Sequence, residues 1–216
     1  FQVDGMSLSI GCSLGIALFP DDGKTLDTLI KCADTAMYLV KARGRGNFRF
    51  YEPQMNVNSL SHIKIDHAMR KAMEHGLFNL HYQPQVSLVN GVLVGTEALI
   101  RWTDAELGMV SPALFIPLAE ESGFIITIGT WVLEEAVRQA SVWQNIGTPV
   151  TVSINVSALQ FQQANFIETV AAALQSSGLS PHLLELELTE SILIHDANET
   201  LARLHALAAL GVALSI

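Results

Sequence analysis

The first quarter of the chain alternates between short strand-like runs and one helix-like run. Residues 7–19 combine β-favouring and small residues, and 47–51 form a second such run. Between them, 25–42 carries apolar residues at near-helical spacing. The composition then shifts, and a further helix is expected over 54–75. The pattern therefore predicts a small α+β unit in residues 1–53, followed by a linker helix.

From residue 76 onward, strands and helices alternate regularly. We expect strands at 77–87, 92–102, 150–158, 183–189 and 211–216. We expect helices between them at 112–122, 127–145, 163–177 and 198–210. Such alternation is typical of a parallel sheet or a (β/α) barrel, so the sequence predicts an α/β fold for 76–216.

The first two of these strands are joined by a short turn. Val89-Asn90-Gly91 leaves no room for a crossover helix, so strands 77–87 and 92–102 should be antiparallel. An ordinary (β/α)₈ barrel has only parallel strands, and the hairpin indicates a variant of that fold. Because the chain stops within the strand 211–216, we interpret it as a truncated part of a longer parent protein.

Three of the expected strands place polar side chains on a single face, because side chains alternate along a strand. That face carries Glu97 and Arg101 on one strand, Asn155 on the next, and Glu185 and Glu187 on the third. An antiparallel sheet with one wet side also produces such alternation. The intervening helices instead favour parallel strands whose polar face lies inside a barrel. Buried carboxylates are costly there unless they are paired or bound to a metal, so we predict a metal site at this face.

The residue types narrow the chemistry of that site. Glu97, Asn155 and Glu187 offer only hard oxygen donors, which suit Mg²⁺ or Mn²⁺. Such ions activate water and neutralise charge in phosphodiester hydrolysis. Arg101 lies on the same face and could clamp a phosphate, the alternative being a surface ion pair.

Composition and charge restrict the class of protein. Half of the residues are hydrophobic and 15% are charged, but no apolar stretch reaches the roughly 18–20 residues of a membrane span. A net charge of −9 argues against a nucleic acid polymer as partner. Cys12 and Cys32 match no metal-binding spacing and are expected to be reduced thiols of a cytoplasmic protein. Any membrane anchor of the parent would lie in an N-terminal region outside this chain.

Several motifs of residues 60–216 resemble those of the EAL family. They occur in the family's order and are Tyr82-Gln83-Pro84, Glu97-Ala98-Leu99 with Arg101-Trp102, Ser111–Gly123, Asn155-Val156-Ser157 and Glu187-Leu188-Thr189-Glu190. The resemblance implies a (β/α)₈ barrel with an antiparallel strand, present here in part. It also implies hydrolysis of cyclic di-GMP to linear pGpG with Mg²⁺ or Mn²⁺. The resemblance further implies that the parent protein could form a homodimer through its EAL domain.

The resemblance assigns roles to individual residues. Glu97, Asn155 and Glu187 would be metal ligands, the two glutamates being part of the catalytic set. Gln83 and Arg101 would contact substrate. 

The resemblance implies that Glu190 would stabilise an active-site loop instead of binding metal. The family continues, beyond a strand like 211–216, with an Asp-Asp-Phe-Gly motif and a catalytic lysine. We therefore expect this part of the parent protein to be inactive alone.

Residues 1–53 resemble the C-terminal part of a GGDEF diguanylate cyclase domain, an α+β fold. The resemblance rests on Ser13–Ala17, on Ala33–Tyr38 and on the run from Lys41 to Asn47. Lys41 and Arg45 would contact GTP phosphates.

Three functions stay open on the sequence. The first is a metal-dependent cyclic di-GMP phosphodiesterase, which the retained glutamates and asparagine favour. The second is a catalytically inactive EAL module that senses cyclic di-GMP or binds a protein. The third is an unrelated metal-dependent (β/α) hydrolase.

Overall fold

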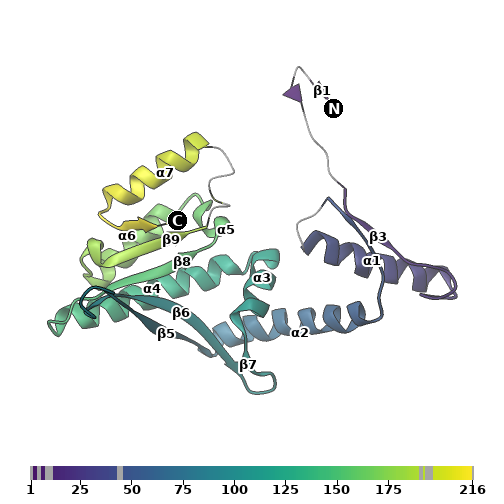
Figure 1. Cartoon of the computed structure of the whole chain (residues 1–216), viewed down its shortest axis with the longest axis horizontal. Helices are drawn as coiled ribbons and strands as arrows, with labels where there is room; N and C mark the ends of the chain where they lie inside the picture. Colours follow the sequence, from purple (N-terminus) through teal and green to yellow (C-terminus); the bar gives the residue numbers. More distant parts are fainter. Residues whose placement is uncertain are drawn as a thin grey trace. The chain divides into compact units, whose positions relative to one another are not determined.

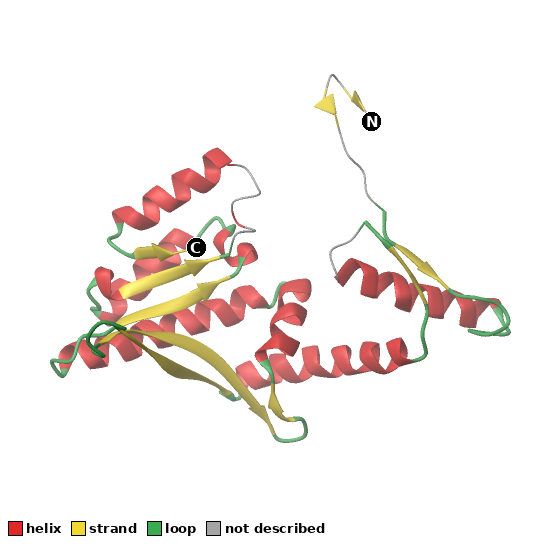
Figure 2. Ribbon diagram, viewed as in Figure 1, coloured by secondary structure: helices red, strands yellow, loops and turns green. Residues whose placement is uncertain are grey.

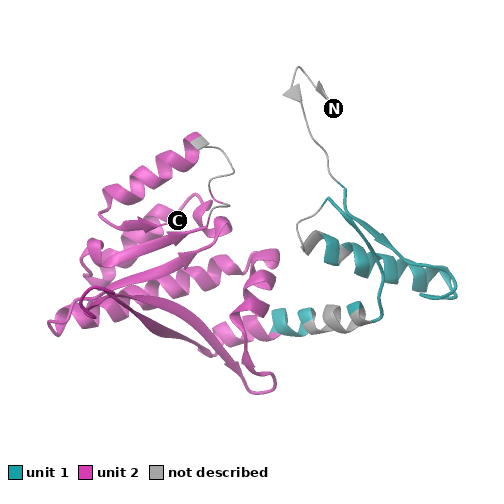
Figure 3. Cartoon of the chain, in the orientation of Figure 1, with its two compact units in different colours: residues 1–67 teal, residues 68–216 magenta. Residues whose placement is uncertain are grey.

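The chain forms two compact units. The computed structural model describes residues 2–3, 6–7, 12–42, 46–189, 192 and 197–215. Residues 1–67 form the first unit and residues 68–216 the second (Figure 3).

In the first unit, one helix packs against a pair of parallel strands. Strand β3 (Leu14–Ile16) pairs with β4 (Phe48–Phe50), and helix α1 (Leu26–Ala42) connects them (Figure 1). Gly15 allows the close approach, because a Cβ there would lie 1.8 Å from the carbonyl oxygen of Ala33. The strand–helix–strand order expected from the sequence is therefore present.

A short antiparallel pair precedes this arrangement, and a long helix follows it. The pair consists of β1 (Gln2–Val3) and β2 (Met6–Ser7). Helix α2 (Gln54–Glu74) occupies the segment in which a linker helix was expected. It spans the division between the two units, which falls after His67.

The second unit is built on a mixed six-stranded sheet in the order β10-β9-β8-β6-β5, with β7 paired to β6. Its strands are β5 (Phe78–Val86), β6 (Leu93–Asp104), β7 (Gly108–Val110), β8 (Thr151–Val156), β9 (Leu184–Leu188) and β10 (Ala213–Ser215). Neighbours from β6 through β8 and β9 to β10 are parallel. The α/β prediction is confirmed, whereas β7 was not expected.

The predicted hairpin is confirmed in detail. Strands β5 and β6 pair antiparallel from Phe78↔Trp102 onward. The amide of Ser87 donates to the carbonyl of Val92, and the amide of Gly91 donates to the carbonyl of Ser87. Gly91 adopts φ +68°, a conformation that favours glycine.

Helices separate most of these strands along the chain and pack against the sheet (Figure 2). They are α3 (Pro112–Ser122), α4 (Ile125–Asn145), α5 (Ala158–Phe161), α6 (Phe166–Ser177), the 3₁₀ turn η1 (Pro181–Leu183) and α7 (Ala197–Ala209). Helix α4 packs on β5, β6 and β8, α7 packs on β10, and α6 contacts both helices. The short helix α5 was not expected as a separate element.

The alternation along the strands separates two faces of the sheet. One face supplies the core, with buried residues Ala98, Ile100, Trp102, Val152, Ile154, Val156, Leu184, Leu186 and Leu188. At one end of this core, the rings of Phe78, Trp102 and Phe115 lie with centroids 5.5–5.8 Å apart. The polar residues singled out in the sequence alternate with the buried ones and so occupy the opposite face.

Candidate active site

The three expected metal ligands lie on three neighbouring strands. Glu97 is on β6, Asn155 on β8 and Glu187 on β9. Asn155 and Glu187 are direct partners across the parallel pair β8–β9. Glu97 is in register with Ser153, two residues before Asn155. The sheet therefore brings together residues that are far apart in the sequence.

A hydrogen bond connects two of these side chains. Nδ2 of Asn155 donates to Oε1 of Glu97 over 2.8 Å. Glu97 and Glu187 are half-buried, whereas Asn155 is exposed. The sequence predicted that this polar face would be enclosed in a barrel. Among the described residues it is only partly shielded from solvent, because strands β10, β9, β8, β6 and β5 form an open sheet whose two end strands are not paired with each other.

The negative charges of the site affect one another. Partial burial raises the pKa of Glu187, and the nearby carboxylates of Glu97 and Glu185 raise it further. Ser153 donates to Oε2 of Glu185 over 2.9 Å and offsets part of the rise at Glu187. This crowding of carboxylates is relieved by protonation or by a cation.

The available donors suit a hard divalent cation. Two carboxylates and one amide, from Glu97, Glu187 and Asn155, are all oxygen ligands. Over the described part of the chain, no three His, Cys, Asp or Glu side chains are grouped closely enough to hold a metal. The amide is therefore needed in addition to the carboxylates.

The two expected substrate contacts flank these ligands. Gln83 is the antiparallel partner of Glu97 and is exposed. Arg101 lies four residues beyond Glu97 on the same strand face, and its guanidinium donates to the carbonyl of Ile100 over 2.8 Å. Within the described residues Arg101 forms no ion pair. Its surface ion-pair alternative is therefore not seen, and its role at a phosphate stays a prediction.

Three residues with predicted roles are not fully described: Glu190, expected at this site, and Lys41 and Arg45, expected to contact GTP in the GGDEF-like part. Arg45 and Glu190 lie outside the described residues. The backbone of Lys41 belongs to α1, but its side chain is outside the description. Their roles stay predictions, as does a homodimer.

The structure also adds contacts that sequence reasoning missed. The Ser153–Glu185 hydrogen bond lies one pleat from Asn155 and Glu187, and both residues belong to the alternating pattern that drew attention to these strands. Arg203 of α7 binds the turn that follows β8. No spacing in the sequence indicated that contact.

The described helices include none that is long and apolar enough to cross a membrane.

Comparison with known proteins identifies two regions. Residues 66–216 match the family described as EAL domain. Residues 1–47 match the family described as Diguanylate cyclase, GGDEF domain.

Curated relatives match the whole chain. It is 42% identical over 217 residues to the bifunctional diguanylate cyclase/cyclic di-GMP phosphodiesterase MucR of Pseudomonas aeruginosa, covering 100% of this chain and 32% of MucR. It is 36% identical over 211 residues to the cyclic di-GMP phosphodiesterase PdeR of Escherichia coli, covering 98% of this chain and 32% of PdeR. The chain thus spans about a third of the length of these relatives.

A solved structure agrees with these matches. The PaMucR phosphodiesterase in complex with c-di-GMP superposes with a TM-score of 0.68 at 43% identity, over 71% of this chain and 62% of that one. The expected barrel-type architecture with one antiparallel strand is consistent with this similarity. By its sequence match over 66–216 and by its fold, the chain belongs to the EAL domain family, with GGDEF-domain sequence ahead of the EAL region.

Proposed function

We propose that the protein containing this chain is a metal-dependent phosphodiesterase that cleaves cyclic di-GMP to linear pGpG. The observation that carries this proposal is the approach of Glu97, Asn155 and Glu187 on three neighbouring strands. Relatives named as cyclic di-GMP phosphodiesterases, and the PaMucR complex with c-di-GMP, support the choice of substrate.

The oxygen donors favour Mg²⁺ or Mn²⁺ over softer metals. When bound, such an ion would supply charge neutralisation and water activation for phosphodiester cleavage. Glu97 and Glu187 would bind it through carboxylates and Asn155 through its amide oxygen. The hydrogen bond between Asn155 and Glu97 would then be exchanged for contacts to the cation.

Two residues of the polar face would hold the substrate. Gln83 lies directly across the β5–β6 pair from Glu97, so a ligand at the carboxylates is within reach of its amide. Arg101 presents a guanidinium further along the same face. A guanidinium can bind two oxygens of one phosphate, which would orient the phosphodiester relative to Glu97.

The test is an assay of pGpG formation by the full-length protein with Mn²⁺ or Mg²⁺. We expect turnover that EDTA abolishes and added metal restores. Glu97→Gln should reduce turnover by at least tenfold, because it removes a negatively charged ligand. Glu106→Gln provides a control, since Glu106 is exposed in the turn between β6 and β7.

Two results would contradict the proposal. Turnover that survives exhaustive chelation would exclude the metal-dependent reaction. Binding of cyclic di-GMP without cleavage would instead identify the EAL region as a sensing module.

A further inference from the structure

The turn after β8 begins directly beside a proposed metal ligand. Ser157 follows Asn155 by two residues and is the N-cap of α5, where its Oγ accepts from the amide of Gln160 over 3.2 Å. The amide of Phe161 donates to the carbonyl of Ser157 over 3.0 Å. We define residues 157–163 as the α5 turn. A shift of this turn would be transmitted through two peptide units to Asn155.

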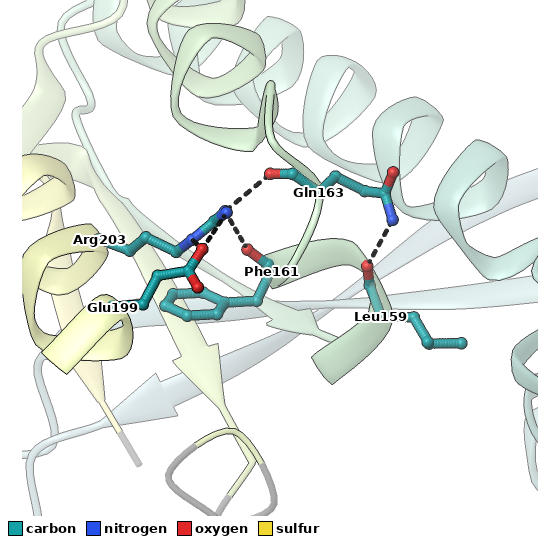
Figure 4. A network of polar contacts seen from close by, with 5 residues as sticks. All are labelled: Leu159, Phe161, Gln163, Glu199 and Arg203. Atoms are coloured by element: carbon teal, nitrogen blue, oxygen red, sulfur yellow. Dashed lines mark hydrogen bonds and ion pairs between the residues drawn. The ribbon is translucent and has the colours of Figure 1, made fainter. Parts of the chain in front are cut away.

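Arg203 of α7 binds the far end of the α5 turn (Figure 4). Its Nη1 donates to the carbonyl oxygens of Phe161 and Gln163 over 3.0 and 2.8 Å. Its Nε and Nη2 donate to Oε1 of Glu199, one helical turn earlier, over 3.2 and 2.9 Å. The Arg203 side chain is 17% exposed and its contacts to the two carbonyl oxygens are partly buried, whereas the side chain of Glu199 is 64% exposed.

Helix α4 confines the same turn through a separate contact. Gln160 is 3% exposed, and its side chain lies against Gly129. A Cβ at position 129 would lie 2.2 Å from Oε1 of Gln160, so this contact depends on glycine. The ring of Phe161 is 1% exposed and lies 6.1 Å from that of Phe166. The α5 turn is therefore held by α4 as well as by α7.

We propose that Arg203 is a positioning residue for Asn155, acting through the α5 turn. Helix α7 follows β9 in the chain, so Arg203 links the segment after β8 to the segment after β9. Those two strands carry Asn155 and Glu187 as direct partners. The link would limit relative movement of the two ligands before a cation binds. This inference rests on the proposed function.

The experiment compares Arg203→Ala with Arg138→Ala in the full-length protein. Arg138 is a matched control, because it also forms an ion pair with a glutamate of its own helix, Glu135, over 2.7 Å. We expect Arg203→Ala to weaken Mn²⁺ binding by about tenfold, the lower end of the range for groups hydrogen-bonded directly to a metal ligand, because Arg203 acts through the α5 turn. At saturating Mn²⁺, KM should stay near the wild-type value and kcat should largely recover.

A second readout requires neither metal nor activity. In metal-free protein, hydrogen exchange of amides in the α5 turn should be faster in Arg203→Ala than in Arg138→Ala. Gly129→Ala, which disturbs the turn from α4, should weaken Mn²⁺ binding in the same direction. Arg203→Lys keeps the charge without the guanidinium fork, so its Mn²⁺ affinity should fall a few-fold. It serves as the test variant if Arg203→Ala does not fold.

Unchanged Mn²⁺ affinity in the folded Arg203 variants, whatever their Tm, would overturn the inference and leave the proposed function intact. A wild-type protein that cleaves cyclic di-GMP without binding Mn²⁺ or Mg²⁺ would overturn the metal role and the inference together. An equal loss of Mn²⁺ affinity in Arg138→Ala and Arg203→Ala would also overturn the inference, because the effect would not be specific to the α5 turn.

Discussion

Asn155 donates a hydrogen bond from Nδ2 to Oε1 of Glu97 over 2.8 Å, and this contact joins strands β8 and β6 at the proposed metal site. Replacing Asn155 by aspartate would remove the donor and set two carboxylates against each other. With EDTA present, we expect Asn155→Asp to lose about 1 kcal/mol of stability, which corresponds to roughly 2–4 °C in Tm. Saturating Mn²⁺ should raise its Tm by more than it raises the wild-type Tm, because the variant offers an additional charged ligand.

Asn90→Asp is the matched control for this change. Asn90 is exposed in the β5–β6 turn, where Oδ1 accepts from the amide of Val92, and aspartate retains that acceptor. Differential scanning fluorimetry of both variants, with EDTA and with Mn²⁺, provides the measurement. Equal Tm values for Asn155→Asp and wild type in EDTA would show that the hydrogen bond contributes nothing to the metal-free fold.

Glu187 provides a prediction about pH. Burial and the charges of Glu97 and Glu185 raise its pKa in the folded protein. Below the ordinary glutamate pKa, the Glu187 side chain is neutral in both the folded and the unfolded protein. Stability is then lost as the pH rises through the raised pKa of Glu187 in the folded protein. Glu187→Gln should therefore stabilise the metal-free protein at pH 7, by less than about 1 kcal/mol because solvent screens the site.

The measurement is urea unfolding of wild type and Glu187→Gln in EDTA at several pH values. The difference should vanish at a pH below about 4, where the wild-type side chain is also neutral. Mn²⁺ should stabilise the wild type and have little effect on the variant. A Glu187→Gln protein less stable than wild type at pH 7 in EDTA would be inconsistent with repulsion at this site.

Arg101 is expected to act on substrate. Its guanidinium donates only to a backbone carbonyl among the contacts resolved for it, which leaves donors for a phosphate. Arg101→Ala should weaken substrate binding by about 1.5–3 kcal/mol, the range for a hydrogen bond to a charged group. Arg101→Lys should recover part of the loss, because it keeps the charge without the fork. Unchanged KM and kcat in Arg101→Ala would assign the residue a surface role.

The main elements could be predicted from the sequence because alternation is a local property. Along 183–189 every second residue is leucine, and the structure buries Leu184, Leu186 and Leu188. The same alternation identified which side chains share the face of Glu187. What it could not provide was the lateral distance between strands. The contact between Asn155 and Glu97 spans 58 positions in the chain and depends on the register of β6 against β8.

Short elements were missed because they provide too few residues for periodicity. Strand β7 has three residues and helix α5 has four. Turn chemistry contained a usable signal for β7: Oδ1 of Asp104 accepts from the amides of Glu106 and Leu107, and Gly108 adopts φ +68°. An Asp followed by Gly four residues later, after a long strand, is consistent with a tight reversal.

Tyr82 leads to a prediction about a buried hydroxyl. Within the described residues its oxygen has no hydrogen-bond partner, while its ring packs edge-on against Trp143 at 4.9 Å. Burial, followed by the charge of Glu135, raises its pKa to about 12. Tyr82→Phe keeps the ring and removes the unpaired group, so we expect equal stability or a gain of up to about 1 kcal/mol at pH 7.

Because an unfolded tyrosine ionises near pH 10, the wild type should lose stability as the pH rises from about 10 to about 12, a loss that Tyr82→Phe should not share. Tyr82→Leu, which loses the aromatic pair, should be less stable than wild type at pH 7. Urea unfolding at pH 7 and pH 11 distinguishes these cases, and a marked loss of stability in Tyr82→Phe at pH 7 would show that the hydroxyl is hydrogen-bonded after all.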